Sequence, residues 1–152
     1  MDRSTAAIAD RADITACLKR LAYRRRLMLV RFELRSSKES SLISTALNHV
    51  WMDRPDATMD EVKAFSAGLE ACEQAGLVRI RYGLPVTLQA DYAVFQQSRL
   101  YADFCDMVSA GSQQPGFLFD IPYMKRGAAV LTSAGRRYIT SELENQKSEE
   151  TA

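Results

Sequence analysis

Six basic side chains gather in or beside segments of the chain whose pattern is typical of strands. Arg79 and Arg81 alternate with apolar residues in the stretch LVRIRYG, residues 77–83. An arginine guanidinium is a planar fork of donors that matches phosphate oxygens, so this set predicts phosphate binding if the fold places it on one surface. An isolated pair is more often the solvent-exposed face of a strand. The other four basic residues follow further along the chain: Lys125, Arg126, Arg136 and Arg137.

Side chains that support catalysis are few. The only histidine, His49, cannot build a histidine-rich metal site and has no acidic neighbour that would make it a general base. Asp103, Cys105 and Asp106 lie close together, but this spacing is common on solvated helix faces. The chain contains no GxxxxGK[ST], GxGxxG, GxSxG or HExxH motif. We therefore predict that the protein is not an enzyme and has no cofactor and no metal.

The composition predicts one globular domain in the cytoplasm. The chain has 152 residues, of which 47% are hydrophobic, enough to bury a core. No apolar run approaches the roughly 20 residues needed to cross a bilayer, so no membrane association is expected. The N-terminal stretch MDRSTAAIADRAD lacks the continuous apolar segment of a secretory signal. Three cysteines without CxxC spacing argue against both a disulfide framework and a zinc site.

Charge is unevenly distributed along the chain. Residues 19–35 hold seven basic side chains and one acid, whereas residues 56–76 hold five acids and one lysine. The basic stretch includes three consecutive arginines at 24–26, which fan out over roughly 200° if they lie on a helix. A solvated helix end with local ion pairs is the favoured interpretation of these arginines, and a nucleic-acid arm is the alternative.

The first half of the chain is predicted to be helical. An N-terminal helix is expected over residues 5–22. Residues 23–35 are densely apolar; a strand is possible, but the leucines, methionine and arginines favour a second helix that is largely buried. Residues 41–51 carry apolar side chains at helical spacing. A further helix begins after Thr58, which forms a capping box with Glu61, and ends at Gly76.

The second half mixes strands and helices. The alternation in residues 77–82 predicts a half-buried strand. Residues 89–109 are predicted to be helical, with a strand over VTLQADYAV as the alternative, and a loop follows at 111–116. An extended segment broken by Pro122 leads into a short strand, AAVLT. Thr132 or Ser133 then caps a last helix that reaches about Glu144, and Gly135 allows that helix to approach the sheet closely.

Two local patterns resemble the winged helix-turn-helix superfamily, which includes bacterial transcriptional regulators and small phage-encoded proteins. One is V-x6-L-E-x4-A-G-L-V, from Val62 to Val78, and the other is L-T-x-x-G-R, from Leu131 to Arg136. The resemblance implies an α+β winged helix-turn-helix fold with an N-terminal helical extension and a helical insertion in the wing. It implies one domain over residues 1–145, with a core at 23–83 and 126–140, the N-terminal helix at 5–22, a wing insertion at 84–125 and a disordered tail at 146–152.

The resemblance also implies double-stranded DNA as the partner, with the helix before Gly76 as the recognition helix. The expected contacts are Lys63, Ser66 and Gln74 on that helix, Arg79, Arg81, Lys125 and Arg126 in the wing, and Arg136 and Arg137 beside it. The function implied is that of a small transcriptional regulator of bacterial or phage origin. Three acids and only one base on the exposed face of the recognition helix weigh against base reading.

The alternative is a winged helix that binds a protein as an adaptor, inhibitor or assembly subunit and does not bind DNA. The acidic recognition helix suits such a partner. The inserted segment is the most aromatic part of the chain, and surplus aromatic area there would form a partner or homodimer surface. The residues expected on that surface are Tyr92, Phe95, Tyr101 and Phe104.

Overall fold

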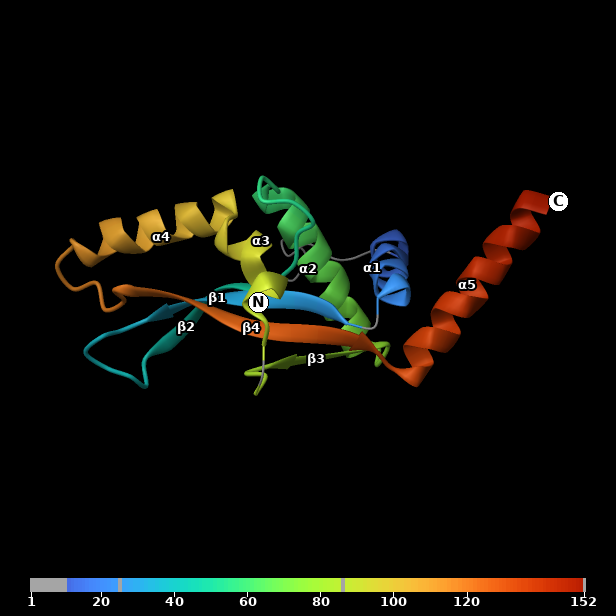
Figure 1. Cartoon of the computed structure of the whole chain (residues 1–152), viewed down its shortest axis with the longest axis horizontal. Helices are drawn as coiled ribbons and strands as arrows, with labels where there is room; N and C mark the ends of the chain where they lie inside the picture. Colours follow the sequence, from blue (N-terminus) through green and yellow to red (C-terminus); the bar gives the residue numbers. More distant parts are fainter. Residues whose placement is uncertain (1–10, 25, 86, 152) are drawn as a thin grey trace.

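The computed structural model describes residues 11–24, 26–85 and 87–151. It is a mixed α+β structure with one four-stranded antiparallel sheet in the order β2-β1-β4-β3 (Figure 1). The expected α+β class is confirmed. In chain order the elements are α1 (Arg11–Tyr23), β1 (Leu27–Arg35), β2 (Ile43–Val50), α2 (Met59–Gln74), β3 (Val78–Tyr82), the 3-10 helix η2 (Gln89–Tyr92), α3 (Ala93–Gln96), α4 (Arg99–Ser112), β4 (Ile121–Leu131) and α5 (Ser133–Thr151).

The prediction of a helix over residues 23–35 is wrong, because residues 27–35 form β1. This strand lies inside the sheet, paired on one side with β2 and on the other with β4. Helices cover both of its faces in the first half, so Leu27, Leu29 and Val30 are all buried. A strand buried on both faces is apolar at consecutive positions and lacks the alternation that marks a half-buried strand. The dense apolar run was therefore misinterpreted as a buried helix.

The helix predicted over residues 41–51 is also wrong, because residues 43–50 form β2, which is an edge strand. Its pairing with β1 shifts register between Val30 and Phe32 and again between Phe32 and Glu33, so the strand carries bulges. The bulges interrupt the alternation of inward and outward side chains along β2. As a result, the apolar residues of this segment match helical spacing. Together β1 and β2 form a β-hairpin in the place where the sequence predicted two helices.

Two hydrophobic cores lie on opposite faces of β1. Val30 and Phe32 pack with Tyr92, Phe95 and residues of α4 in the first core. Leu27 and Leu29 pack in the second core with residues of α1, α2, β3, β4 and α5. Successive side chains of a strand point to opposite faces, so this one strand supplies both cores. Helix α2 joins the two cores, because Val62 belongs to the first and Leu69 to the second.

Several predictions for the rest of the chain are confirmed. Helix α2 begins after Thr58, whose hydroxyl accepts a hydrogen bond from the Glu61 amide at 3.2 Å, and the chain turns after it at Gly76 with φ of 75°. Strand β3 spans 78–82, and its pairing with β4 places Arg79 opposite Val130. Residues 89–112 are helical, although the helix is interrupted, and Ser98 caps its longest part. The strand alternative for this region is excluded.

Strand β4 is longer than predicted and runs without interruption from Ile121 to Leu131. Pro122 lies within it, opposite Leu34 of β1. A proline is tolerated there because β3 pairs only with residues 127–131, which leaves the other side of Pro122 without a partner strand. In Figure 1, β1 and β4 run side by side through the centre of the sheet.

Helix α5 follows β4 directly. The Thr132 hydroxyl accepts a hydrogen bond from the Gly135 amide at 3.0 Å and donates one to the Gly76 carbonyl at 2.7 Å. Thr132 is therefore the cap, as predicted. The helix continues to Thr151 rather than ending near Glu144, so residues 146–151, expected to be a disordered tail, are helical. The part of the N-terminal helix predicted at residues 5–10 lies outside the described residues.

The side chain of Tyr82 links all four strands. It extends from β3 across Gly127 of β4, where an added Cβ would lie 2.6 Å from the ring. The Arg31 guanidinium of β1 stacks on the ring at 4.1 Å, and the Tyr82 hydroxyl lies 2.8 Å from Nδ1 of His49 in β2. Glycine at position 127 is required for this crossing, because any side chain there would displace the ring.

We predict that Gly135→Ala destabilises the protein. A Cβ at this position would lie 2.0 Å from the backbone oxygen of Leu77, and a backbone atom cannot move aside as a flexible side chain can. Overpacking of this kind costs about 1–3 kcal/mol, measured as the free energy of unfolding in urea. Ser133→Ala, at an exposed position of the same helical turn, is the control and should be close to neutral. Equal stabilities of the two variants would contradict this packing.

We predict that stability falls between pH 6.5 and pH 5 because of His49. Burial, reinforced by the positive charge of Arg31, lowers the pKa of this imidazole from 6.5 to about 4. Glu73 acts in the opposite direction, but its carboxylate is exposed and 3.9 Å from Nε2. As the pH falls through 6.5 the unfolded chain takes up a proton that the folded chain does not, so unfolding is favoured.

The expected loss is about 1–2 kcal/mol between pH 7 and pH 5, after allowance for solvent screening. It is measured by chemical denaturation at a series of pH values. The control is His49→Asn, because His49 has φ of 48° and asparagine tolerates the left-handed region. The variant should lose this part of the pH dependence, and the same slope in both proteins would show that His49 does not titrate abnormally.

Candidate arginine surface and adjoining cavity

Four arginines lie on one face of the sheet, and we call this group the arginine face: Arg26, Arg79, Arg81 and Arg126. Arg79 and Arg81 alternate with the inward-facing Val78 and Ile80 in β3. Both arginines are exposed. Because β3 is an edge strand, no further strand restricts access to them from the side.

The register of the sheet brings the other two arginines to the same face. Arg81 is opposite Ala128, and Arg126 is two residues further along β4, on the same side as Ala128. Arg79 is opposite Val130. Leu27 of β1 is opposite Ala129 of β4. Extended by one residue, this pairing places Arg26 opposite Val130 as well, so that Arg26 and Arg79 flank Val130 on the same face.

The charges of the arginine face are not neutralised. Within the described part of the chain, none of its four arginines forms an ion pair. Arg126 is half-buried; it donates to the Thr87 hydroxyl at 3.0 Å and stacks on Tyr92 at 5.0 Å. Burial raises the pKa of Tyr92, while the positive charges of Arg26 and Arg126 oppose this rise. Arg26 and Arg126 are therefore both close enough to act on the same hydroxyl.

Two further arginines extend the positive surface toward α5. Arg24, between α1 and β1, and Arg136, in the first turn of α5, line one cleft of about 450 Å³. Arg136 donates weakly to the Leu131 carbonyl at 3.4 Å, which holds it near the end of β4. Arg137 is exposed at the next position of α5, about 100° further around the helix.

The structure separates the remaining predicted DNA contacts from the arginine face. Lys125 pairs with Arg31 on the opposite face of the sheet, although it is adjacent to Arg126 in sequence. The half-buried Ser66 donates to the Asn48 carbonyl at 2.8 Å and so ties α2 to β2. Lys63 and Gln74 are exposed on α2. This helix packs its Leu69 and Cys72 on the face that carries Val78 and Ala129, opposite to the arginine face.

The aromatic partner surface predicted in the insertion is not formed by the expected residues. Tyr92, Phe95 and Phe104 are at most 7% exposed, and Tyr101 is half-buried. They pack in the first core, where Phe32 stacks on Phe104 with centroids 5.3 Å apart. These rings are needed to cover one face of β1, so they are not available to a partner.

Arg24 is exposed and directly follows the last residue of α1, so the prediction of a solvated helix end is confirmed for it. The local ion pairs expected of Arg24–Arg26 are not formed by the two arginines that are described. Neither Arg24 nor Arg26 has an acidic partner in the described part of the chain. Arg25 lies outside it. A strand over residues 27–35 places Arg26 on the same side as Arg79 only once the pairing of β1 and β3 with β4 is known.

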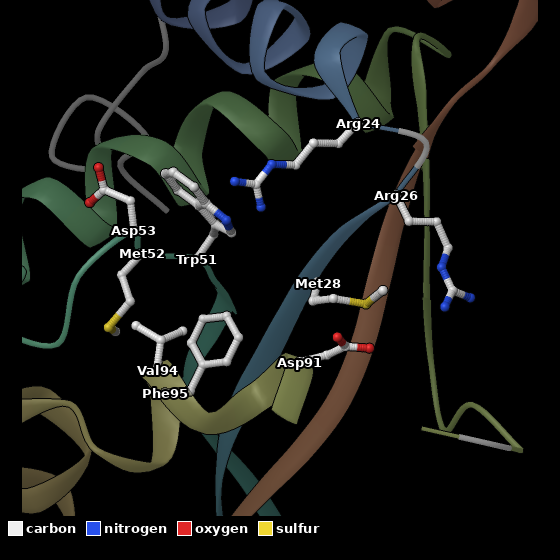
Figure 2. Close-up of a pocket in the computed structure, with 9 residues that line it drawn as sticks. All are labelled: Arg24, Arg26, Met28, Trp51, Met52, Asp53, Asp91, Val94 and Phe95. Atoms are coloured by element: carbon white, nitrogen blue, oxygen red, sulfur yellow. The ribbon is translucent and has the colours of Figure 1, made fainter. Parts of the chain in front are cut away.

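A cavity of about 600 Å³ adjoins the arginine face at Arg26 (Figure 2). It lies between the start of β1, the segment after β2 and the helices η2 and α3. Figure 2 shows Arg24 reaching toward Trp51, while Arg26 points away from Trp51 and passes over β4. We call this cavity of about 600 Å³ the Trp51 cavity. Its lining residues are Arg24, Arg26, Met28, Trp51, Met52, Asp53, Asp91, Val94 and Phe95.

Other kinds of site find no support among residues 11–24, 26–85 and 87–151. No three His, Cys, Asp or Glu side chains there converge as metal ligands. The described helices include none with the length and apolar character of a membrane span. No family model matches the chain, and no curated protein or solved structure shows significant similarity to it.

Proposed function

We propose that the protein binds the phosphate backbone of double-stranded DNA through the arginine face. The observation that carries this proposal is the alignment of Arg26, Arg79, Arg81 and Arg126 on one side of the sheet, where none of them forms an ion pair with a described residue. Arginines on one surface without acidic partners suit an anionic ligand. A polyanion supplies several phosphates at once, and release of its counterions favours binding.

The geometry of β3 supports contact with a backbone rather than with a single phosphate. Arg79 and Arg81 lie two residues apart on one strand, which separates their Cα atoms by about 6–7 Å. The Arg126 guanidinium is held in place by Thr87 and Tyr92, so less side-chain entropy is lost when it binds. All four groups are permanent cations without a nucleophile or general base, which favours binding over catalysis.

The sequence resemblance supports DNA as the polyanion. In a winged helix, the strands after the recognition helix contact the DNA backbone, and β3 and β4 occupy that place in the chain. The recognition helix itself has a different position here, since the second half of α2 packs on the other face of the sheet, while Val62 in its first half belongs to the first core. Its exposed residues also include Asp60, Glu61, Glu70 and Glu73. We therefore propose backbone binding with little base reading by α2.

The full form of this proposal is a small cytoplasmic transcriptional regulator of bacterial or phage origin that works as a dimer. That extension, like the winged helix-turn-helix assignment, rests on the sequence resemblance. The hairpin formed by β1 and β2 departs from the family pattern, which has helices there.

A protein-binding role is the second candidate, and a groove beside α2 favours it. The groove has a volume of about 360 Å³ and a largely apolar lining, and it lies between β2, α2 and α4. Met59 and Met107 line it and are 42% and 54% exposed. With the acids on the outer side of α2, this surface suits a partner that has both apolar and basic side chains.

We predict that affinity for a duplex falls steeply with salt and depends on the arginine face. Four phosphate contacts give a slope of about −3 to −4 in a plot of log affinity against log salt concentration. Arg79→Ala/Arg81→Ala should weaken binding to all sequences alike and reduce the slope by about two. Fluorescence anisotropy with labelled duplexes of unrelated sequence, at several salt concentrations, measures both effects.

Lys125→Ala is the matched control. It removes the same charge from the neighbouring position of β4, but on the opposite face, so affinity and slope should change little. A duplex affinity that is independent of salt, or an equal loss in the control and the double variant, would contradict binding at this face. Absence of duplex binding at low salt would favour the protein-binding role.

A further inference from the structure

We propose that the Trp51 cavity binds one nucleotide, with its phosphate at Arg24 and Arg26 and its base in the interior. An amino group of the base then donates a hydrogen bond to Asp91. The inference deepens the proposed function, on which it rests where the nucleotide belongs to bound DNA. A free nucleotide has the same chemistry and is distinguished in the experiment below.

The cationic end of the cavity suits a phosphate. Arg24 and Arg26 are exposed and have no acidic partner in the described part of the chain. In Figure 2 their side chains start from neighbouring points of the backbone and diverge, one toward Trp51 and the other over β4. One phosphate can therefore meet both guanidinium groups only after one of these exposed side chains turns toward the other.

The opposite charge in the cavity is the exposed carboxylate of Asp91. Asp91, in η2, forms no ion pair with a described residue. The second carboxylate, Asp53, is already occupied by Arg54 at 3.2 Å and Arg20 at 3.8 Å. Asp91 repels a phosphate and accepts from an amino group, as carboxylates do with the N4 amine of cytosine. The ligand is therefore oriented, with its anionic end at the arginines.

The size and walls of the cavity suit a base. About 600 Å³ lies within the range of small-molecule sites, which combine apolar walls with a few polar groups. Met28, Met52, Val94 and Phe95 supply the apolar wall. A fatty acid would use the wall and the arginines, but it would form no hydrogen bond with Asp91. An acidic peptide would bring further carboxylates toward Asp91 and Asp53.

Trp51 contributes an edge to this wall and serves as a reporter. Arg20 lies 4.9 Å from the centre of its ring, and the Phe65 ring packs against it with centroids 4.5 Å apart. Its faces are therefore engaged by the protein, and a base approaches it from the side. Because the chain has only one tryptophan, a change in tryptophan emission reports on the surroundings of Trp51, which include this cavity.

The cavity is continuous with the arginine face through Arg26. This residue lines the cavity, and with Arg126 it acts on the Tyr92 hydroxyl. A strand whose phosphates follow Arg79, Arg81 and Arg126 thus has its next phosphate at the mouth of the cavity. An unpaired nucleotide at that point can place its base inside while the rest of the duplex stays on the sheet.

The experiment compares a fully paired duplex with two duplexes that carry one unpaired nucleotide, either cytosine or thymine. Thymine has no amino group, so it is the matched ligand control. We expect the cytosine duplex to bind about tenfold more tightly than the other two, as one charge-assisted hydrogen bond predicts, and to change Trp51 emission. Free CMP and dTMP are titrated in parallel by the same emission.

Variants then test the role of Asp91. Asp91→Asn should abolish the preference for cytosine over thymine. Asp106→Asn, the same change at an exposed position of α4, should keep that preference. If CMP changes the emission but an unpaired cytosine adds no affinity, the ligand is the free nucleotide. If an unpaired cytosine adds affinity but CMP does not change the emission, the ligand is an unpaired nucleotide of the strand.

Three results separate this inference from the proposed function. Salt-dependent binding of the paired duplex, with no response of Trp51 to cytosine or CMP, overturns the nucleotide site and leaves the DNA proposal intact. A response of Trp51 emission to CMP without any duplex binding supports the nucleotide site and contradicts the DNA proposal. A cytosine preference that persists in Asp91→Asn overturns the assigned role of the carboxylate.

Discussion

The burial of β1 on both faces is the constraint on which the rest of the structure depends. The strand has neighbours on both sides in the sheet, and its alternate residues enter two separate cores. Those cores need two groups of helices: α1, the second half of α2 and the start of α5 for one, and η2, α3 and α4 for the other. The aromatic residues of the insertion are therefore structural, because without them Val30 and Phe32 would be exposed to water.

The same alternation sorts the basic residues into two groups with different chemistry. On one face, Arg31 and Arg35 flank the buried carboxylate of Glu33, at 3.5 Å and 2.7 Å. Each also stacks on a tyrosine, Tyr82 or Tyr123. A buried carboxylate needs such partners, so these arginines serve the fold. On the other face none of the four arginines forms an ion pair with a described residue, and it is there that a phosphate can bind.

Adjacent residues of one strand can therefore differ completely in role, as Lys125 and Arg126 do. The proposed DNA contact is a property of the sheet face rather than of a helix. The acidic outer side of α2 lies away from that face, which removes the conflict between an acidic helix and a polyanionic partner. The Trp51 cavity adds to this surface the two features that the arginines lack, an apolar wall and a free acceptor, and both are held by the helices that cover β1.

The sequence by itself determined those elements whose signals are local. Thr58 and Gly76 marked the ends of α2, the alternation around Arg79 and Arg81 marked β3, and Thr132 with Gly135 marked the start of α5. A helix cap is formed by residues a few positions apart, so its side chains carry the information. The common side of Arg79 and Arg81 followed from the same alternation.

Only the tertiary structure decided the identity of residues 27–35 and 43–50. Residues 43–50 form an edge strand that pairs with β1 and carries bulges. Residues 27–35 pair with β4, which is some 90 residues away in the register, and helices bury both of their faces. Such burial removes the period of two and leaves an apolar run that intrinsic propensity assigns to a helix. The place of Arg26 in the arginine face depended on that pairing as well, because a residue's side of the sheet is fixed by its partner strand. The Trp51 cavity, whose walls come from three separate segments of the chain, had no signal in the sequence for the same reason.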